Sequence, residues 1–174
     1  SMLAPPVTFL IDGEQYIAIL AGTGGGNNHG GDTLGFHAEH LASLKYGNAG
    51  RLLAFKLNGG KTLPRLDLLD KSIPQQPTLA STEFQISRGT ELYGEYCAFC
   101  HGTAVRAGPA LPDLRMMKND SHQLFKEIVY EGILSDNGMA AFSDVLSEND
   151  VESIYHYIVK TASIDRQIQL EQSN

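Results

Sequence analysis

The sequence predicts a mainly α-helical domain in residues 83–174, preceded by a short antiparallel β segment, and three observations predict it. Two β-rich runs at residues 7–11 and 15–20 are joined by Asp12-Gly13, and a third run follows at 51–57. After residue 83, apolar residues recur at helical spacing in three stretches. The helical half also contains Cys97-Ala-Phe-Cys100-His101, the attachment motif of a c-type haem. We therefore expect three to four helices around one covalently bound haem c.

Residues 22–31, within the β segment, are rich in glycine but match neither common phosphate-binding loop. Asn27 stands where the dinucleotide fingerprint requires glycine, and no Gly-Lys-Ser/Thr follows. Nearby His29, His37 and His40 lack a cysteine or carboxylate set that would complete a metal site. We interpret them as surface or loop histidines.

Residues 1–60 have the pattern of a fragment of a larger domain. Three strands and a loop do not make an independently stable sheet, because an isolated hairpin is marginal in water. Residues 61–82 follow with Pro64, Pro74 and Pro77, which exclude a continuous helix and favour extended backbone. We expect this segment to be a linker.

Three helices are predicted after the linker. The first covers 84–97, with Ser87 as a candidate N-cap, and the middle one covers 121–131. The last begins at Ser147, which forms a pattern close to a capping box with Asp150. Its apolar stripe consists of Val151, Ile154, Tyr155 and Ile158.

The Cys97–His101 motif has two competing interpretations, and each lacks its partners. A zinc half-site needs a second pair of ligands, but the chain holds no cysteine beyond Cys97 and Cys100. A thioredoxin-like redox pair needs a βαβ context, whereas the flanking residues have a helical pattern. In a haem site the two thiols reach the two vinyl groups of the porphyrin and His101 ligates the iron.

Composition and charge narrow the range of functions. The 174 residues are 42% hydrophobic and 19% charged, with no apolar run long enough to span a bilayer. Residues 83–174 carry 7 Lys and Arg against 14 Asp and Glu, while residues 1–82 carry 6 of each. This balance makes nucleic acid an improbable partner. The acidic surface is either an electrostatic docking face or simply a solvated one.

The helical half resembles the class I cytochromes c, which cross their first and last helices where a glycine meets aromatic residues. Gly89 and Tyr93 against Ile154 and Tyr157 fit that arrangement. The resemblance implies that Met139, in a loop before the last helix, is the sixth iron ligand.

Other residues remain open as ligands of the iron. Met116 and Met117 precede the middle helix, His122 lies in its first turn, and His156 is expected on an outer or lateral face. If Met139 were an ordinary core methionine, the iron would be open to gas binding or peroxidase-like chemistry.

Class I cytochromes also use a proline carbonyl to orient the proximal histidine, and residues 107–115 resemble that loop. Pro112 is the favoured acceptor for His101, with Pro109 as the alternative. The resemblance further suggests that Arg115 meets a haem propionate, unless it is a surface arginine. Phe142 is expected to help exclude water.

The β segment contains DGEQYIAILAG and GRLLAFKLNG, which resemble the end of the β-propeller in quinohaemoprotein alcohol dehydrogenases. The resemblance implies three parts: a propeller fragment at 1–60, a linker at 61–82 and a cytochrome c domain at 83–174. It covers none of the ligands for pyrroloquinoline quinone (PQQ) or calcium. The segment by itself is therefore not expected to oxidise alcohols.

In such an enzyme the PQQ domain would donate electrons to this haem. The acceptor would be a cupredoxin, another cytochrome or a quinone, and haem attachment of this type implies a periplasmic location. Two alternatives stay open: a free-standing electron-carrier cytochrome, and a haem sensor or peroxidase with an open iron site.

Overall fold

The computed structural model describes residues 4–21, 51–61, 70–107 and 111–172. The chain divides into two compact units, residues 1–70 with 108–111, and residues 71–107 with 112–174. The histidines 29, 37 and 40, the glycine-rich stretch and Pro109 lie outside the described residues.

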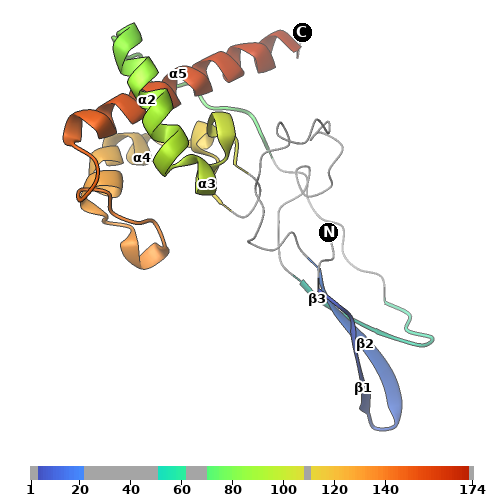
Figure 1. The fold of residues 1–174 in the computed structure, drawn as a ribbon. Helices are drawn as coiled ribbons and strands as arrows, with labels where there is room; N and C mark the ends of the chain where they lie inside the picture. Colours follow the sequence, from blue (N-terminus) through green and yellow to red (C-terminus); the bar gives the residue numbers. More distant parts are fainter. Residues whose placement is uncertain (1–3, 22–50, 62–69, 108–110, 173–174) are drawn as a thin grey trace. The chain divides into compact units, whose positions relative to one another are not determined.

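The first unit contains the predicted antiparallel sheet. Its strands are β1 (Val7–Ile11), β2 (Glu14–Ala21) and β3 (Arg51–Lys56), paired in the order β1-β2-β3 (Figure 1). Asp12 and Gly13 have φ values of 51° and 80°, as the tight hairpin turn between β1 and β2 requires. The prediction of a short antiparallel β segment is therefore confirmed.

Both faces of this sheet carry exposed apolar side chains. The strand register places Phe9 and Leu52 on one face and Leu10 and Phe55 on the other. Leu10 and Leu52 are 71% and 69% exposed. Because soluble proteins rarely expose apolar side chains on both faces of a sheet, these strands have the character of a buried layer.

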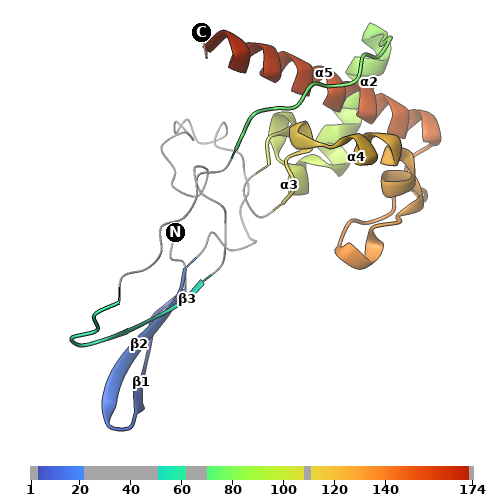
Figure 2. The ribbon, with the colours of Figure 1, turned by 180° about the vertical axis from the view of Figure 1, so that it is seen from behind.

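The second unit is helical, and its longest helices cross. Helix α2 (Glu83–Tyr96) lies across α5 (Glu148–Gln172) in both views (Figures 1 and 2). A Cβ built on Gly89 would lie 2.6 Å from the carbonyl carbon of Ser153 and 2.9 Å from Cβ of Tyr157. The rings of Tyr93 and Tyr157 are 5.2 Å apart. The predicted crossing at a glycine is therefore confirmed.

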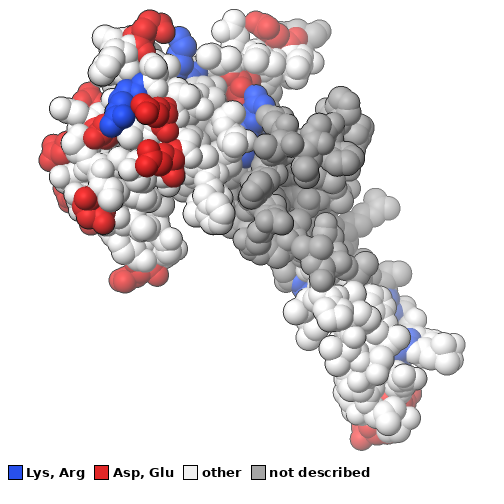
Figure 3. Space-filling model, in the orientation of Figure 1, with Lys and Arg blue, Asp and Glu red and all other residues white. Residues whose placement is uncertain are grey.

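The core of this unit lies where α2, α5 and the shorter segments meet. Its buried apolar residues are Leu92, Tyr93, Val105, Phe125, Val129, Leu146, Val151, Ile154 and Ile158. On the face of the helical unit that Figure 3 shows, acidic side chains outnumber basic ones, as the charge count indicates.

The starts of the two long helices differ in how well the sequence predicted them. Ser147 and Asp150 exchange hydrogen bonds of 3.1 and 3.2 Å at the start of α5, which confirms the predicted cap. Helix α2 is capped by Thr82 instead of Ser87, because Thr82 forms a reciprocal capping box with Gln85. The Ser87 prediction is wrong.

The middle helix predicted over 121–131 ends at Gly132 as predicted, but it is interrupted at Leu124. Helix α4 (Asn119–Gln123) is followed by a break at Leu124, after which residues 125–126 are helical again and lead into a π-helical turn, η5 (Glu127–Glu131). Gly132 ends this turn with φ 75°. Apolar periodicity places the buried Phe125 and Val129 but does not distinguish an α turn from a π turn.

Four short helical segments complete the unit. They are α3 (Ala98–His101), η3 (Thr103–Val105), η4 (Leu114–Met116) and η6 (Ser135–Asn137). Residues 71–81, part of the predicted linker, have no regular secondary structure and contact α5. The backbone N–H of Ile73 donates to Gln169 on α5, with an N···Oε1 distance of 2.9 Å.

Candidate haem site

The motif cysteines lie on a single helical turn that directly follows α2. Cys97 ends α2, its N–H donating to Tyr93 O at 3.0 Å, and its own carbonyl accepts from His101 N at 2.9 Å. Cys97 is buried, Cys100 is exposed, and no disulfide joins them. Three residues apart on a helix, the two side chains lie on neighbouring positions of one face.

The environment of Cys97 does not suit a redox-active dithiol. Burial, reinforced by the nearby Cys100, raises the pKa of the Cys97 thiol to about 12. Redox-active cysteines work as thiolates and need a lowered pKa. The thioredoxin-like alternative therefore lacks its chemical basis as well as its fold.

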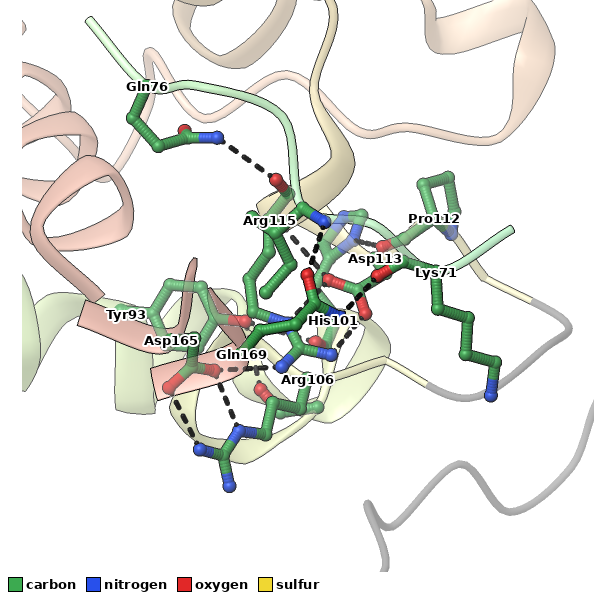
Figure 4. A network of polar contacts seen from close by, with 12 residues as sticks. Lys71, Gln76, Tyr93, His101, Arg106, Pro112, Asp113, Arg115, Asp165 and Gln169 are labelled. Atoms are coloured by element: carbon green, nitrogen blue, oxygen red, sulfur yellow. Dashed lines mark hydrogen bonds and ion pairs between the residues drawn. The ribbon is translucent and has the colours of Figure 1, made fainter. Parts of the chain in front are cut away.

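His101 is oriented by the backbone. Its Nδ1 lies 2.9 Å from the carbonyl oxygen of Pro112 (Figure 4). A carbonyl only accepts, so Nδ1 carries the proton and Nε2 is left as the nitrogen that can ligate a metal. Tyr93, only 2% exposed, donates from its hydroxyl to the carbonyls of His101 and Gly102 at 3.1 and 2.8 Å. The ring and its backbone are thus both held in place.

Arg115 belongs to an ion-pair cluster that the sequence did not predict. Its guanidinium contacts Asp113 through Nε and Nη2, and Asp165 on α5 through Nη1 at 2.8 Å. Asp165 also accepts two hydrogen bonds from Arg106 (Figure 4). Burial alone would raise the pKa of Asp165, but the two arginines outweigh it, and this pKa lies below its ordinary value.

A signal for Asp165 existed in the sequence. The apolar stripe of α5 runs through Val151, Ile154, Ile158 and Ala162, and Asp165 is the next position at helical spacing. A carboxylate on a buried stripe requires a partner. Nothing local identifies Arg106 or Arg115 as that partner, because they lie 59 and 50 residues away.

Met139 and Phe142 lie in the segment between η6 and α5, partly buried against the core. Main-chain hydrogen bonds hold this segment: Met139 N donates to Leu134 O at 3.2 Å, and Phe142 N donates to Val129 O at 3.0 Å. The ring of Phe142 meets that of Tyr96 edge-on, with centroids 6.2 Å apart.

The two other described histidines have protein partners. Nδ1 of His122 lies 3.1 Å from the hydroxyl of Tyr155, and Nδ1 of His156 lies 2.7 Å from that of Ser81. His156 is buried, with Ser81 lying against it, so its predicted outer or lateral position is wrong. Among the described residues, no three His, Cys, Asp or Glu side chains form a metal site.

Comparisons with known proteins extend these observations. Residues 84–158 match the family model for cytochrome C oxidase, cbb3-type, subunit III. The chain is 36% identical over 161 residues to quinohaemoprotein alcohol dehydrogenase ADH IIB of Pseudomonas putida, covering 91% of this chain and 22% of that protein. It is 32% identical over 168 residues to the dehydrogenase subunit of alcohol dehydrogenase (quinone) from Gluconobacter oxydans, covering 94% and 21%.

A solved structure agrees with these relatives. Quinohaemoprotein alcohol dehydrogenase ADHIIG from Pseudomonas putida HK5 superimposes with a TM-score of 0.81 and 32% identity, over 95% of this chain and 23% of that one. The chain is related to the quinohaemoprotein alcohol dehydrogenases, and its helical half is a cytochrome c domain. It spans about a fifth of the length of these relatives and corresponds to their C-terminal cytochrome part.

The residues of the cytochrome c domain fit the haem that such a domain implies. The motif supplies two thiols and an imidazole whose Nδ1 is already bonded, and Gly102 permits the turn that follows. A Cβ on Gly102 would lie 2.7 Å from the carbonyl carbon of Arg106. Partly buried apolar side chains suited to a flat hydrophobic group are Leu114, Met117, Ile128, Tyr130, Met139 and Phe142.

Proposed function

We propose that the chain binds one haem c covalently through Cys97 and Cys100, that His101 and Met139 would ligate its iron, and that the chain works in electron transfer. The observation that carries the proposal is the hydrogen bond from His101 Nδ1 to Pro112 O. It fixes the tautomer and ring orientation that an iron-ligating histidine needs. Methionine opposite histidine is the ligand pair of cytochromes c.

The remaining predicted site residues support this arrangement. Phe142, held edge-on against Tyr96, would help to keep water away from the ligand side. The guanidinium of Arg115 has five N–H donors, and its contacts with the two aspartates use three of them. Its other N–H groups would meet a haem propionate.

When bound, the haem supplies a one-electron couple. We infer that the chain, with its haem, would receive electrons from the PQQ site of a larger alcohol dehydrogenase and deliver them to a cupredoxin, another cytochrome or a quinone. PQQ and calcium would be held by parts of that enzyme outside this chain. Thioether attachment favours a periplasmic location, and no helix in the described part of the chain is long and apolar enough to cross a bilayer.

Residues 1–60 would be the end of the β-propeller that carries the quinone, with 61–82 as the linker. Exposed apolar side chains on both faces of the sheet support this assignment. Phe9 and Leu52 lie on one face, Leu10 and Phe55 lie on the other, and all four are exposed. A propeller blade is covered on both faces by its neighbours, which would remove these side chains from water.

Optical spectra of the haem-loaded chain, oxidised and reduced, test the proposed ligation of the iron. The ferric protein should show the weak far-red band of sulfur ligation, and Met139→Ala should abolish it. Met117→Ala is the matched control, because Met117 is also partly buried against the core. We expect Met117→Ala to keep the band.

Two other results would overturn the proposal. A wild-type protein without the band that binds carbon monoxide on reduction has an open iron site, as expected for a sensor or a peroxidase. Loss of the band in Met117→Ala but not in Met139→Ala would assign the ligand to the other methionine.

A further inference from the structure

We propose that Asp165 is a positioning residue for the proximal ligand: from α5 it anchors Arg106 and Arg115, which lie on either side in sequence of Pro112, whose carbonyl accepts the hydrogen bond of His101. This inference rests on the proposed ligation of iron by His101. It assigns a role to a side chain that lies far from the haem motif in sequence.

The contacts of Asp165 reach a residue on each side of Pro112 in the sequence. Arg106, which precedes Pro112, donates to Asp165 through Nε at 3.0 Å and Nη2 at 2.9 Å. Arg115, which follows Pro112, donates through Nη1 at 2.8 Å. One carboxylate on a long helix therefore contacts both Arg106 and Arg115 (Figure 4).

Asp113 extends this clamp to the residue next to Pro112. Its carboxylate accepts from Nε and Nη2 of Arg115 at 3.0 and 2.6 Å, and from the backbone N–H of Arg115 at 3.0 Å. The peptide group that Pro112 shares with Asp113 contains the carbonyl that His101 contacts. A shift of Arg115 is thus passed through Asp113 to the acceptor of the histidine.

The burial of Asp165 indicates a role beyond stability. Its side chain is 8% exposed, whereas those of Arg106 and Arg115 are 40% and 20% exposed. A buried ion pair loses so much hydration that an apolar residue in its place is often equally stabilising. An aspartate at this position of the stripe therefore fits a requirement for one loop geometry.

The position of the Pro112 carbonyl affects the haem electronically. A well-aligned acceptor at Nδ1 makes the imidazole a stronger donor to the metal, which favours ferric over ferrous iron. Releasing the clamp weakens this hydrogen bond and makes the haem easier to reduce. We expect the reduction potential to rise when either Asp165 or Arg106 is replaced.

The experiment compares Asp165→Asn with Arg106→Gln in the haem-loaded full chain. As charges alone, the two changes act in opposite directions: loss of a carboxylate raises the potential, and loss of a guanidinium lowers it. As parts of one clamp, both raise it. We expect a rise of about tenfold in the reduction equilibrium constant for each variant, which is about 59 mV for one electron.

Hydrogen exchange of the His101 Nδ1 proton, followed by NMR in the ferrous protein, gives a second readout. Both variants should exchange this proton faster than wild type. Arg88→Gln is the control: it breaks an ion pair with Asp150 that also joins α2 to α5 but does not involve the loop. If Asp165→Asn folds poorly, Asp165→Glu takes its place in the experiment. Because it keeps the charge, its reduction potential should lie close to that of wild type.

Shifts of opposite sign in the two variants would show that the cluster acts only through its charge. Unchanged potentials and unchanged Nδ1 exchange would show that it only stabilises the fold. Either result refutes the inference while the far-red band remains. Absence of that band in wild type refutes the proposed ligation instead, so the two failures are distinguishable.

Discussion

The contact between α2 and α5 allows a sharp test, because it depends on the absence of one side chain. A Cβ at Gly89 would lie 2.6 Å from the carbonyl carbon of Ser153 and closer still to its oxygen. Ordinary contact begins at 3.4 Å. The atoms in the way belong to the backbone of α5 and cannot rotate aside, so Gly89→Ala must separate the helices.

The size of the effect follows from two opposing terms. Overpacking of a tight core costs about 3 kcal/mol at the upper end of its usual range. Alanine is favoured over glycine inside a helix by about 1 kcal/mol. The expected net loss is about 2 kcal/mol, which lowers the Tm of a domain of this size by about 8–16 °C.

Thermal unfolding of the haem-loaded protein, followed by far-ultraviolet circular dichroism, measures this shift. Gly94→Ala is the matched control, because Gly94 lies on the same helix and a Cβ there meets nothing within 4 Å. It should raise the Tm by about 4–8 °C through helix propensity alone. A Gly89→Ala protein as stable as wild type would refute the backbone contact between the helices.

Three further predictions concern other elements. Ser147→Ala removes the reciprocal cap of α5 and should lower the free energy of unfolding in urea by about 1 kcal/mol. Gly132→Ala puts a Cβ at φ 75° and 2.5 Å from that of Ala141, so it should displace the following segment, weaken the far-red band and speed binding of imidazole at the position of Met139. The lowered pKa of Asp165 means that its contribution to stability is present above its unfolded pKa and is lost as pH falls through the folded value. The Tm of wild type should therefore decrease when the pH is lowered below about 4. The Tm of Asp165→Asn should lack this part of the pH dependence.

The features that the sequence predicted correctly are encoded locally. Ser147 with Asp150 caps the helix that they begin. The hairpin turn at Asp12-Gly13 needs only two residues with positive φ. Such signals depend only on neighbouring residues, so contacts with distant parts of the chain do not change them.

The features that the sequence missed depend on distant residues or on hydrogen-bond spacing. His156 is buried because Ser81, 75 residues earlier, lies against it. The π turn at 127–131 preserves the apolar pattern of an ordinary helix. The Thr82 cap is different, because its Thr-x-x-Gln pattern is visible in the sequence as a capping box.

The two sides of the proposed haem site are held by different kinds of contact. On the His101 side, buried side chains fix the backbone: Tyr93 bonds two carbonyls, and Asp165 holds the loop of Pro112. On the Met139 side, the segment is held through main-chain hydrogen bonds. A ligand fixed by buried side chains is the harder one to release, so exogenous ligands should displace Met139 first. Electron transfer needs little movement of either iron ligand. Of the two, His101 is the ligand that this structure holds more rigidly.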